Sequence, residues 1–136
     1  MKEYVLDANA LVRLFRDAPG AEIVDRLVRQ AKSGKARLSI SVGNLSEVLY
    51  VMSRYVRPDE ALRFIEKTRD AVQAVSIDER ASLDAGMLRI RNKLGFADCF
   101  AAELALRTGA TLVTADPDFE RLGKALKVLA LPRHVQ

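Results

Sequence analysis

The chain has 136 residues, of which 49% are hydrophobic and 29% charged, and this composition fits one globular domain with a buried core. The formal net charge of +4 comes with 22 Lys and Arg residues scattered along the sequence, so charge favours a polyanionic partner without identifying one. Cys99 and His134 are the single cysteine and the single histidine, which excludes internal disulfides, cysteine zinc sites and catalytic histidine pairs, and leaves carboxylates to carry any catalysis.

The first half of the chain predicts two strands, each followed by helices. Residues 4–6 form a short apolar run that ends at an acid, which predicts a buried strand. Apolar residues at helical spacing then predict helices over residues 8–16 and 23–31, separated by a Pro-Gly pair. Residues 37–41 alternate apolar with polar positions and predict a second strand. The next helix is predicted from one apolar stripe, made of Val42, Leu45, Val48, Leu49 and Met52.

The second half of the chain continues this alternation. Pro58 is predicted to open a helix, because proline suits the first helical position. Residues 74–77 predict a third strand, and Asp78 is predicted to cap a helix that runs to about Leu94, with Gly95 just beyond its end. The remaining elements are predicted as a helix over residues 98–107, a strand over 111–114, a short helix from Pro117 and an edge strand at 128–129.

Strands that alternate with helices from end to end predict an α/β domain, with a central, mainly parallel β-sheet flanked by helices on both faces. We expect a single domain over residues 1–136, with its core at about residues 3–131 and a short C-terminal tail. No apolar run approaches the ~20 residues that cross a bilayer, and an acid comes too early in the chain for a signal peptide. We therefore expect a cytoplasmic protein that does not bind a membrane.

Four acids are candidates for a functional site. Asp7 follows the first predicted strand and Asp116 the fourth, and because parallel strands share one direction, both should lie at the same edge of the sheet. Asp98 opens a predicted helix, and Glu47 lies roughly opposite the apolar stripe of its own helix. The alternative is structural, since each aspartate stands where a helix cap would and Glu47 would then be an ordinary surface residue.

Convergence of these acids would favour a divalent cation. Several carboxylates in one cleft repel one another, and without cations some of them would have to hold protons. Mg²⁺ (or Mn²⁺) removes that conflict, because hard ions of this kind prefer oxygen ligands. Such an ion can polarise a phosphodiester and lower the pKa of a water, which suits hydrolysis without histidine.

Four local patterns occur in an order that resembles one family. Asp7 and Asn9 follow the first strand as D-x-N, and Glu47 lies in the helix after the second strand. Asp98 begins a D-x-x-x-A-x-x-A helix, and residues 114–119 read T-x-D-x-D-F at the end of a strand. Over nearly the whole chain, these patterns resemble the PIN-domain ribonucleases, particularly the VapC-type toxins of toxin–antitoxin modules.

The resemblance implies a divalent-metal-dependent endoribonuclease with the strand order 3-2-1-4-5, which acts on RNA, forms a homodimer and is bound by a cognate antitoxin. It also implies that Mg²⁺ (or Mn²⁺) is bound by Asp7, Glu47, Asp98 and Asp116, with Asp118 as a provisional further ligand. Asn9 and Thr114 are expected to orient the carboxylates or a water. For Thr114 the alternative is a plain strand residue, because threonine is common in strands.

Four basic residues lie close in sequence to the proposed ligands, and we hypothesise that they contact RNA phosphates. They are Arg13, Arg16, Arg91 and Lys93. The alternative for each is an ordinary solvated surface position, which is where Arg and Lys usually lie.

Two other classes of protein remain as alternatives. A phospho-acceptor receiver domain also has strand-end aspartates, but the sequence lacks its paired acids after the first strand and its lysine after the fifth. A non-catalytic PIN-like module that binds RNA or protein would share the fold without binding a metal. The full set of acids argues against that module, and an aromatic content of 6% argues against RNA recognition by stacking.

Overall fold

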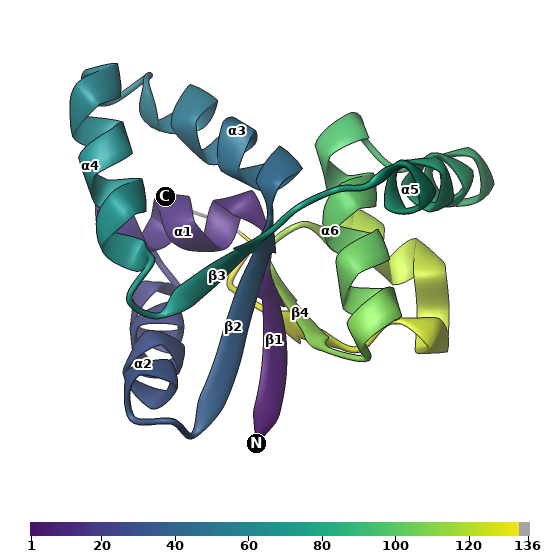
Figure 1. Cartoon of the computed structure of the whole chain (residues 1–136), viewed down its shortest axis with the longest axis horizontal. Coiled ribbons are helices and arrows are strands. Elements are labelled where there is room, and N and C mark those ends of the chain that lie inside the picture. Colours follow the sequence, from purple (N-terminus) through teal and green to yellow (C-terminus); the bar gives the residue numbers. More distant parts are fainter. Residues whose placement is uncertain (134–136) are drawn as a thin grey trace.

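A parallel β-sheet forms the middle layer of the molecule (Figure 1). The computed structural model describes residues 1–133, so His134 and the end of the predicted tail lie outside the described residues. Within this range the sheet has five strands in the order β3-β2-β1-β4-β5, and every neighbouring pair is parallel. The strands are β1 (Lys2–Leu6), β2 (Ala36–Ser41), β3 (Val72–Val75), β4 (Thr111–Thr114) and β5 (Val128–Ala130). The predicted α/β class and strand order are confirmed.

Helices cover both faces of this sheet, as Figure 1 shows. One layer contains α1 (Ala8–Arg16), α2 (Ala21–Lys32), α3 (Val42–Met52) and α4 (Pro58–Thr68). The other layer contains α5 (Glu79–Asn92), α6 (Phe96–Thr108) and the 3₁₀ segment η1 (Pro117–Ala125). None of the helices within residues 1–133 is long and apolar enough to cross a membrane.

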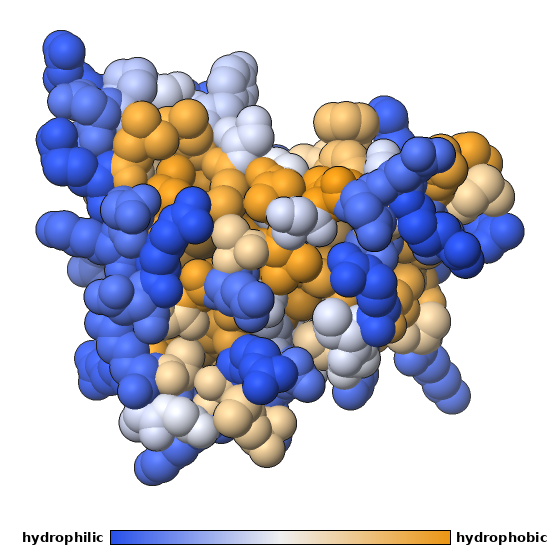
Figure 2. Space-filling view, viewed as in Figure 1, coloured by the Kyte–Doolittle hydropathy of each residue, from blue (hydrophilic) through white to orange (hydrophobic). Residues whose placement is uncertain are grey.

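Successive residues of the central strands point into two separate cores. Leu6 and Val113 pack in the core beneath α1 to α4, whereas Val5 and Leu112 pack in the core beneath α5, α6 and η1. This two-residue period is that of strand geometry, so β1 and β4 are buried on both faces. On the side shown in Figure 2, hydrophobic residues gather between the hydrophilic outer surfaces of the helices. The carboxyl ends of β1 and β4 are therefore held between two packed layers.

The third strand begins two residues earlier than predicted. It occupies Val72–Val75 and not residues 74–77. Val72 is buried and pairs with Leu38 of β2, whereas the exposed Gln73 interrupts the apolar run in the sequence. Pairing with β2, which the sequence of this segment does not reveal, sets the start of the strand.

The predicted role of Gly95 at the end of the long helix is wrong. Lys93 takes the left-handed conformation there, with φ of 55°, while Gly95 has φ of −64° and precedes α6 as its cap. Arg89 Nε donates to the Leu94 carbonyl at 3.1 Å, and Arg121 Nη1 donates to the Lys93 carbonyl at 2.8 Å. Arginine side chains thus bind carbonyls in a turn where a glycine motif was expected.

The start of α3 also departs from its predicted apolar stripe. Val48 and Met52 are buried as expected, but Val42 is 38% exposed and Asn44 is fully buried in its place. A Cβ added to Gly43 would lie only 2.9 Å from Cδ2 of Phe100 on α6. The first turn of α3 therefore approaches α6 closely, and this contact decides which of its residues are buried.

We predict that Gly43→Ala destabilises the protein by about 1 kcal/mol, because overpacking costs roughly 1–3 kcal/mol and better helix propensity recovers about 1 kcal/mol. Gly86→Ala in α5 is the matched control, since a Cβ there would meet no atom within 4 Å and should preserve or raise stability. Chemical unfolding of both variants measures the difference. Equal stabilisation by the two substitutions would contradict the close contact between α3 and α6.

Candidate active site

Asp7 is a buried acid at the carboxyl end of β1. The residue is 2% exposed, and both of its carboxylate oxygens accept hydrogen bonds. Oδ1 accepts from the Ala8 amide at 2.9 Å, which caps α1, while Oδ2 accepts from Asn9 Nδ2 at 3.0 Å and Thr114 Oγ1 at 2.7 Å. Asp7 is thus a helix cap and also part of a polar network at the end of the sheet.

The Thr114 hydroxyl joins the acids that follow the two central strands. Besides donating to Asp7, it accepts from Asn9 Nδ2 at 3.2 Å and from the Asp116 amide at 3.0 Å. Asn9 Oδ1 in turn accepts from the Ala115 amide at 3.1 Å. Thr114 is 1% exposed, so these bonds satisfy a hydroxyl that water does not reach. The network fixes the spacing between Asp7 and Asp116, and an orienting role for Asn9 and Thr114 stays our prediction.

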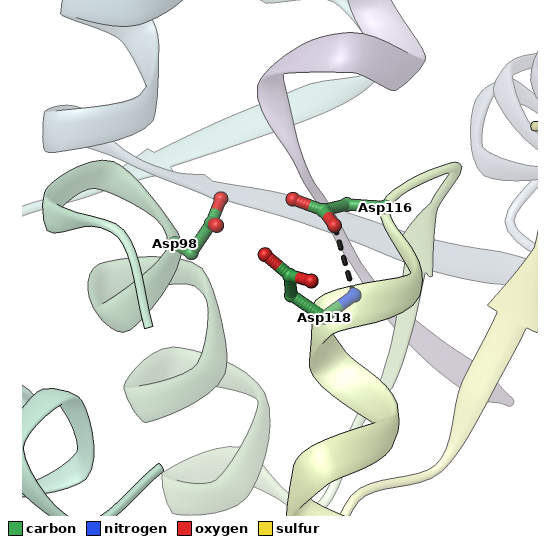
Figure 3. A group of neighbouring side chains, drawn as sticks. All are labelled: Asp98, Asp116 and Asp118. Carbon is green, nitrogen blue, oxygen red and sulfur yellow. Dashed lines mark hydrogen bonds between the residues drawn. The ribbon is translucent and has the colours of Figure 1, made fainter. Parts of the chain in front are cut away.

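Three acids form a tight group at this edge of the sheet (Figure 3). One carboxylate oxygen from each of Asp98, Asp116 and Asp118 lies within 4.8 Å of the other two. Asp98 projects from the first turn of α6, which Gly95 caps, while Asp116 and Asp118 come from the start of η1. Asp116 Oδ1 accepts from the Asp118 amide at 2.9 Å, and Asp118 also pairs with Arg121 at 3.3 Å. The provisional acid Asp118 therefore lies beside two of the predicted ligands.

A cavity of about 240 Å³ connects this group to the other two acids. Asp7, Glu47, Asp98 and Asp116 all line it, so the structure brings the four predicted acids to one space. Glu47 reaches the cavity from α3 and is half-buried, which is not the environment of an ordinary surface glutamate. Binding of a metal by these residues stays a prediction.

Burial and crowding favour protonation of the cluster. Burial, opposed by the Thr114 hydrogen bond and reinforced by the negative charge of Glu47, raises the pKa of Asp7 to about 6. Burial, followed by the charges of Asp7 and Asp116, raises the pKa of Asp98 to about 7. Burial also raises the pKa of Glu47. The fully ionised cluster without a cation is therefore unfavourable at neutral pH.

Two of the four predicted RNA-contacting residues, Arg13 and Arg16, line the cavity. Arg13 Nη1 donates to the carbonyl of Pro19 at 3.1 Å and to that of Pro132, so its guanidinium holds the end of the described chain against α1. Arg16 lies over the Tyr55 ring, with Cζ 4.0 Å from the ring centroid, and donates to its hydroxyl at 3.2 Å. Arg16 is therefore better placed than Arg13 to contact a bound anion.

Arg91 and Lys93 do not contribute to the wall of this cavity. Arg91 lines a separate groove between α5 and α6, and Lys93 is exposed just beyond α5. Arg91 lies on α5, on the outer side of α6 (Figure 1). Lys93 comes near the acids through its backbone, because its carbonyl and the Asp118 carboxylate both bind the Arg121 guanidinium.

Asn44 belongs to the surroundings of the site and escapes prediction from the sequence. Its Nδ2 donates at 3.1 Å to the carbonyl of Ala97, the residue before Asp98. The one signal in the sequence is its position three residues before Glu47, since residues at that spacing share a helix face.

The comparisons with known proteins agree with this arrangement. The model of the PIN domain family matches residues 4–125. This match excludes the receiver-domain alternative. A search of curated protein sequences finds no match.

Three solved structures have a similar fold. VapBC2 from Rickettsia felis bound to a promoter DNA fragment has a TM-score of 0.76 and 22% identity, with 95% of this chain and 98% of that chain covered. DNA-bound VapBC from Salmonella typhimurium has a TM-score of 0.74 and 21% identity, with 96% and 98% covered. VapC20 from Mycobacterium tuberculosis, described as a sarcin–ricin loop cleaving toxin, has a TM-score of 0.70 and 13% identity, with 99% and 100% covered. At these identities the likeness shows a common fold.

We predict that the metal-free protein loses thermal stability as the pH rises from about 5 to about 8. Asp7 and Asp98 have folded pKa values of about 6 and about 7, above their ordinary value of 3.8. The folded state therefore binds more protons than the unfolded state in this window, so stability falls as the pH rises through the folded pKa values. Calorimetry in the presence of a chelator measures the profile.

Asp98→Asn removes the group whose pKa is raised to about 7 and should flatten that profile. The variant should also melt at a higher temperature than the original protein at pH 8, because it relieves like-charge repulsion. A profile as steep as that of the original protein would contradict the assignment of the pH dependence to this cluster.

Proposed function

The chain belongs to the PIN domain family, and on that premise we propose that it is a divalent-metal-dependent endoribonuclease, the toxin of a type II toxin–antitoxin pair. The observation that carries this proposal is the convergence of Asp98, Asp116 and Asp118 within 4.8 Å. Asp98 and Asp116 also share a cavity wall with Asp7 and Glu47. Like charges collected in this way raise the free energy of the fold, and a cation would lower it.

The donor set fits Mg²⁺ (or Mn²⁺). Every candidate ligand atom is a carboxylate oxygen, and hard divalent ions prefer such ligands. The raised pKa values of Asp7 and Asp98 indicate a place where positive charge would be stabilised. Asp98, Asp116 and Asp118 would hold the ion, with Asp7 and Glu47 completing the site. When bound, such an ion polarises the scissile phosphodiester and supplies an activated water.

The other side chains of the cavity would position ligands and substrate. Thr114 and Asn9 hold the Asp7 carboxylate through hydrogen bonds, so it can meet a cation without rearrangement. Carboxylate oxygens that do not bind the ion would accept hydrogen bonds from the attacking water and orient it toward phosphorus. Arg16, in the cavity wall, would pair with a phosphate of the RNA.

The partners are part of the same proposal. The three solved structures described above are VapC and VapBC proteins, which supports a cognate antitoxin as the partner of this chain. We also propose RNA as the substrate, a cytoplasmic location and a homodimer. Exposed apolar side chains on α5, those of Leu83, Met87 and Ile90, offer surface for association.

We predict that the protein cleaves RNA in the presence of Mg²⁺ or Mn²⁺ and that excess chelator abolishes the cleavage. Asp98→Asn and Asp116→Asn should each lower the rate by more than the roughly 10–100-fold that follows loss of a residue supporting a metal ligand. A time course of cleavage in total RNA measures the rate. Mapping the cleaved ends detects the product even when only a single tRNA or rRNA site is cut.

Asp84→Asn in α5 is the matched control for these substitutions. Asp84 is half-exposed, pairs with Arg80 at 3.2 Å and lies outside the cavity wall, so the variant should cleave at the original rate. Cleavage that survives chelation, or full activity of both cluster variants, would refute the proposed mechanism. Binding of RNA without cleavage under any metal condition would favour the non-catalytic module.

A further inference from the structure

Asn44 is a buried polar residue in an unfavourable position for stability. It lies in the first turn of α3 and is 0% exposed. In the part of the chain that the structure describes, its Oδ1 is the one buried side-chain nitrogen or oxygen without a hydrogen-bond partner. Exchanging Oδ1 and Nδ2 by a flip of the side-chain amide does not give Oδ1 a donor. Oδ1 would then face the carbonyl oxygen of Ala97, which is also an acceptor. A buried acceptor without a donor destabilises a fold.

Packing alone would favour an apolar residue at this position. Val48 and Met52, four and eight residues further along the same helix face, are both fully buried. Leucine has the same branched shape as asparagine and carries no polar atom that would stay unpartnered. The presence of asparagine therefore points to its amide donors, and not to filling of space.

Those donors face two parts of the candidate active site. Nδ2 donates at 3.1 Å to the carbonyl of Ala97, which directly precedes Asp98 in the first turn of α6. The same side chain lies beside the Glu47 carboxylate, one turn along α3, where the two can interact by hydrogen bonding. Next to it, Gly43 allows α3 to come close to Phe100 of α6. The amide thus lies at the contact between the two helices that carry Glu47 and Asp98.

We propose that Asn44 is a positioning residue whose amide sets the separation between Glu47 on α3 and Asp98 on α6. This inference rests on the proposed metal-dependent function. The Thr114 hydroxyl ties Asp7 to Asp116 across the central strands. Glu47 and Asp98 come from helices in different layers, and Asn44 supplies the corresponding link between them. A cation held by acids of both helices depends on that separation.

Calorimetric titration of the metal-free protein with Mn²⁺ tests this role without relying on RNA cleavage. Asn44→Leu removes the amide donors, so its Mn²⁺ affinity should fall about 10-fold or more. Asn92→Leu is the matched control, since Asn92 Nδ2 donates to the Leu88 carbonyl at 3.1 Å within α5, and this variant should bind Mn²⁺ as the original protein does.

A double substitution separates positioning from a general structural effect. In a Glu47→Gln background, Asn44→Leu should lower the Mn²⁺ affinity little further, because the group that it positions is already altered. If Asn44→Leu does not fold, Asn44→Ser gives the same test, since one hydroxyl can donate to only one acceptor at a time and Mn²⁺ affinity should again fall.

The outcomes distinguish the inference from the function on which it rests. An unchanged Mn²⁺ affinity in either folded Asn44 variant, whatever its melting temperature, would overturn the positioning role and leave the proposed function standing. Failure of the original protein to bind Mn²⁺ at all would overturn the proposed function and this inference together.

Discussion

Repulsion between carboxylates that the fold holds together is the constraint on which the rest of the site depends. Asp7 and Asp116 follow two adjacent central strands, while Glu47 and Asp98 arrive on helices from the two layers that cover the sheet. Burial and the neighbouring charges raise the pKa of Asp98 to about 7. The sheet, covered on both faces, keeps these groups close although they repel one another. A divalent cation would relieve this repulsion, and the free energy released would contribute to its binding.

We assign the geometry of the cluster to two buried polar residues. Thr114 connects the acids at the strand ends, because its hydroxyl donates to Asp7 and accepts from the Asp116 amide. From the contact of Asn44 with the Ala97 carbonyl, we infer that this side chain connects the acids on the two helices. Both side chains are almost or completely inaccessible to water, so their hydrogen bonds act in a region of low dielectric constant where geometry is held firmly.

The sequence was most informative where topology alone places a residue. Parallel strands share one direction, so Asp7 and Asp116 could be assigned to one edge from the strand pattern. Glu47 and Asp98 required the family resemblance, because the sequence does not reveal where α3 and α6 meet. The same contact explains the reversed burial of Val42 and Asn44, which the periodicity of α3 could not indicate. At the end of α5 the rule for glycine was misleading, since arginine side chains bind the carbonyls there.

The most direct test of the central claim is a crystal structure of the protein soaked in Mn²⁺, with diffraction recorded at the manganese absorption edge. We predict an anomalous peak among Asp98, Asp116 and Asp118, with carboxylate oxygens at about 2.1 Å from the ion. A peak confined to surface carboxylates elsewhere, or an empty cluster at a Mn²⁺ concentration that saturates RNA cleavage, would contradict the assignment of these acids as the metal centre.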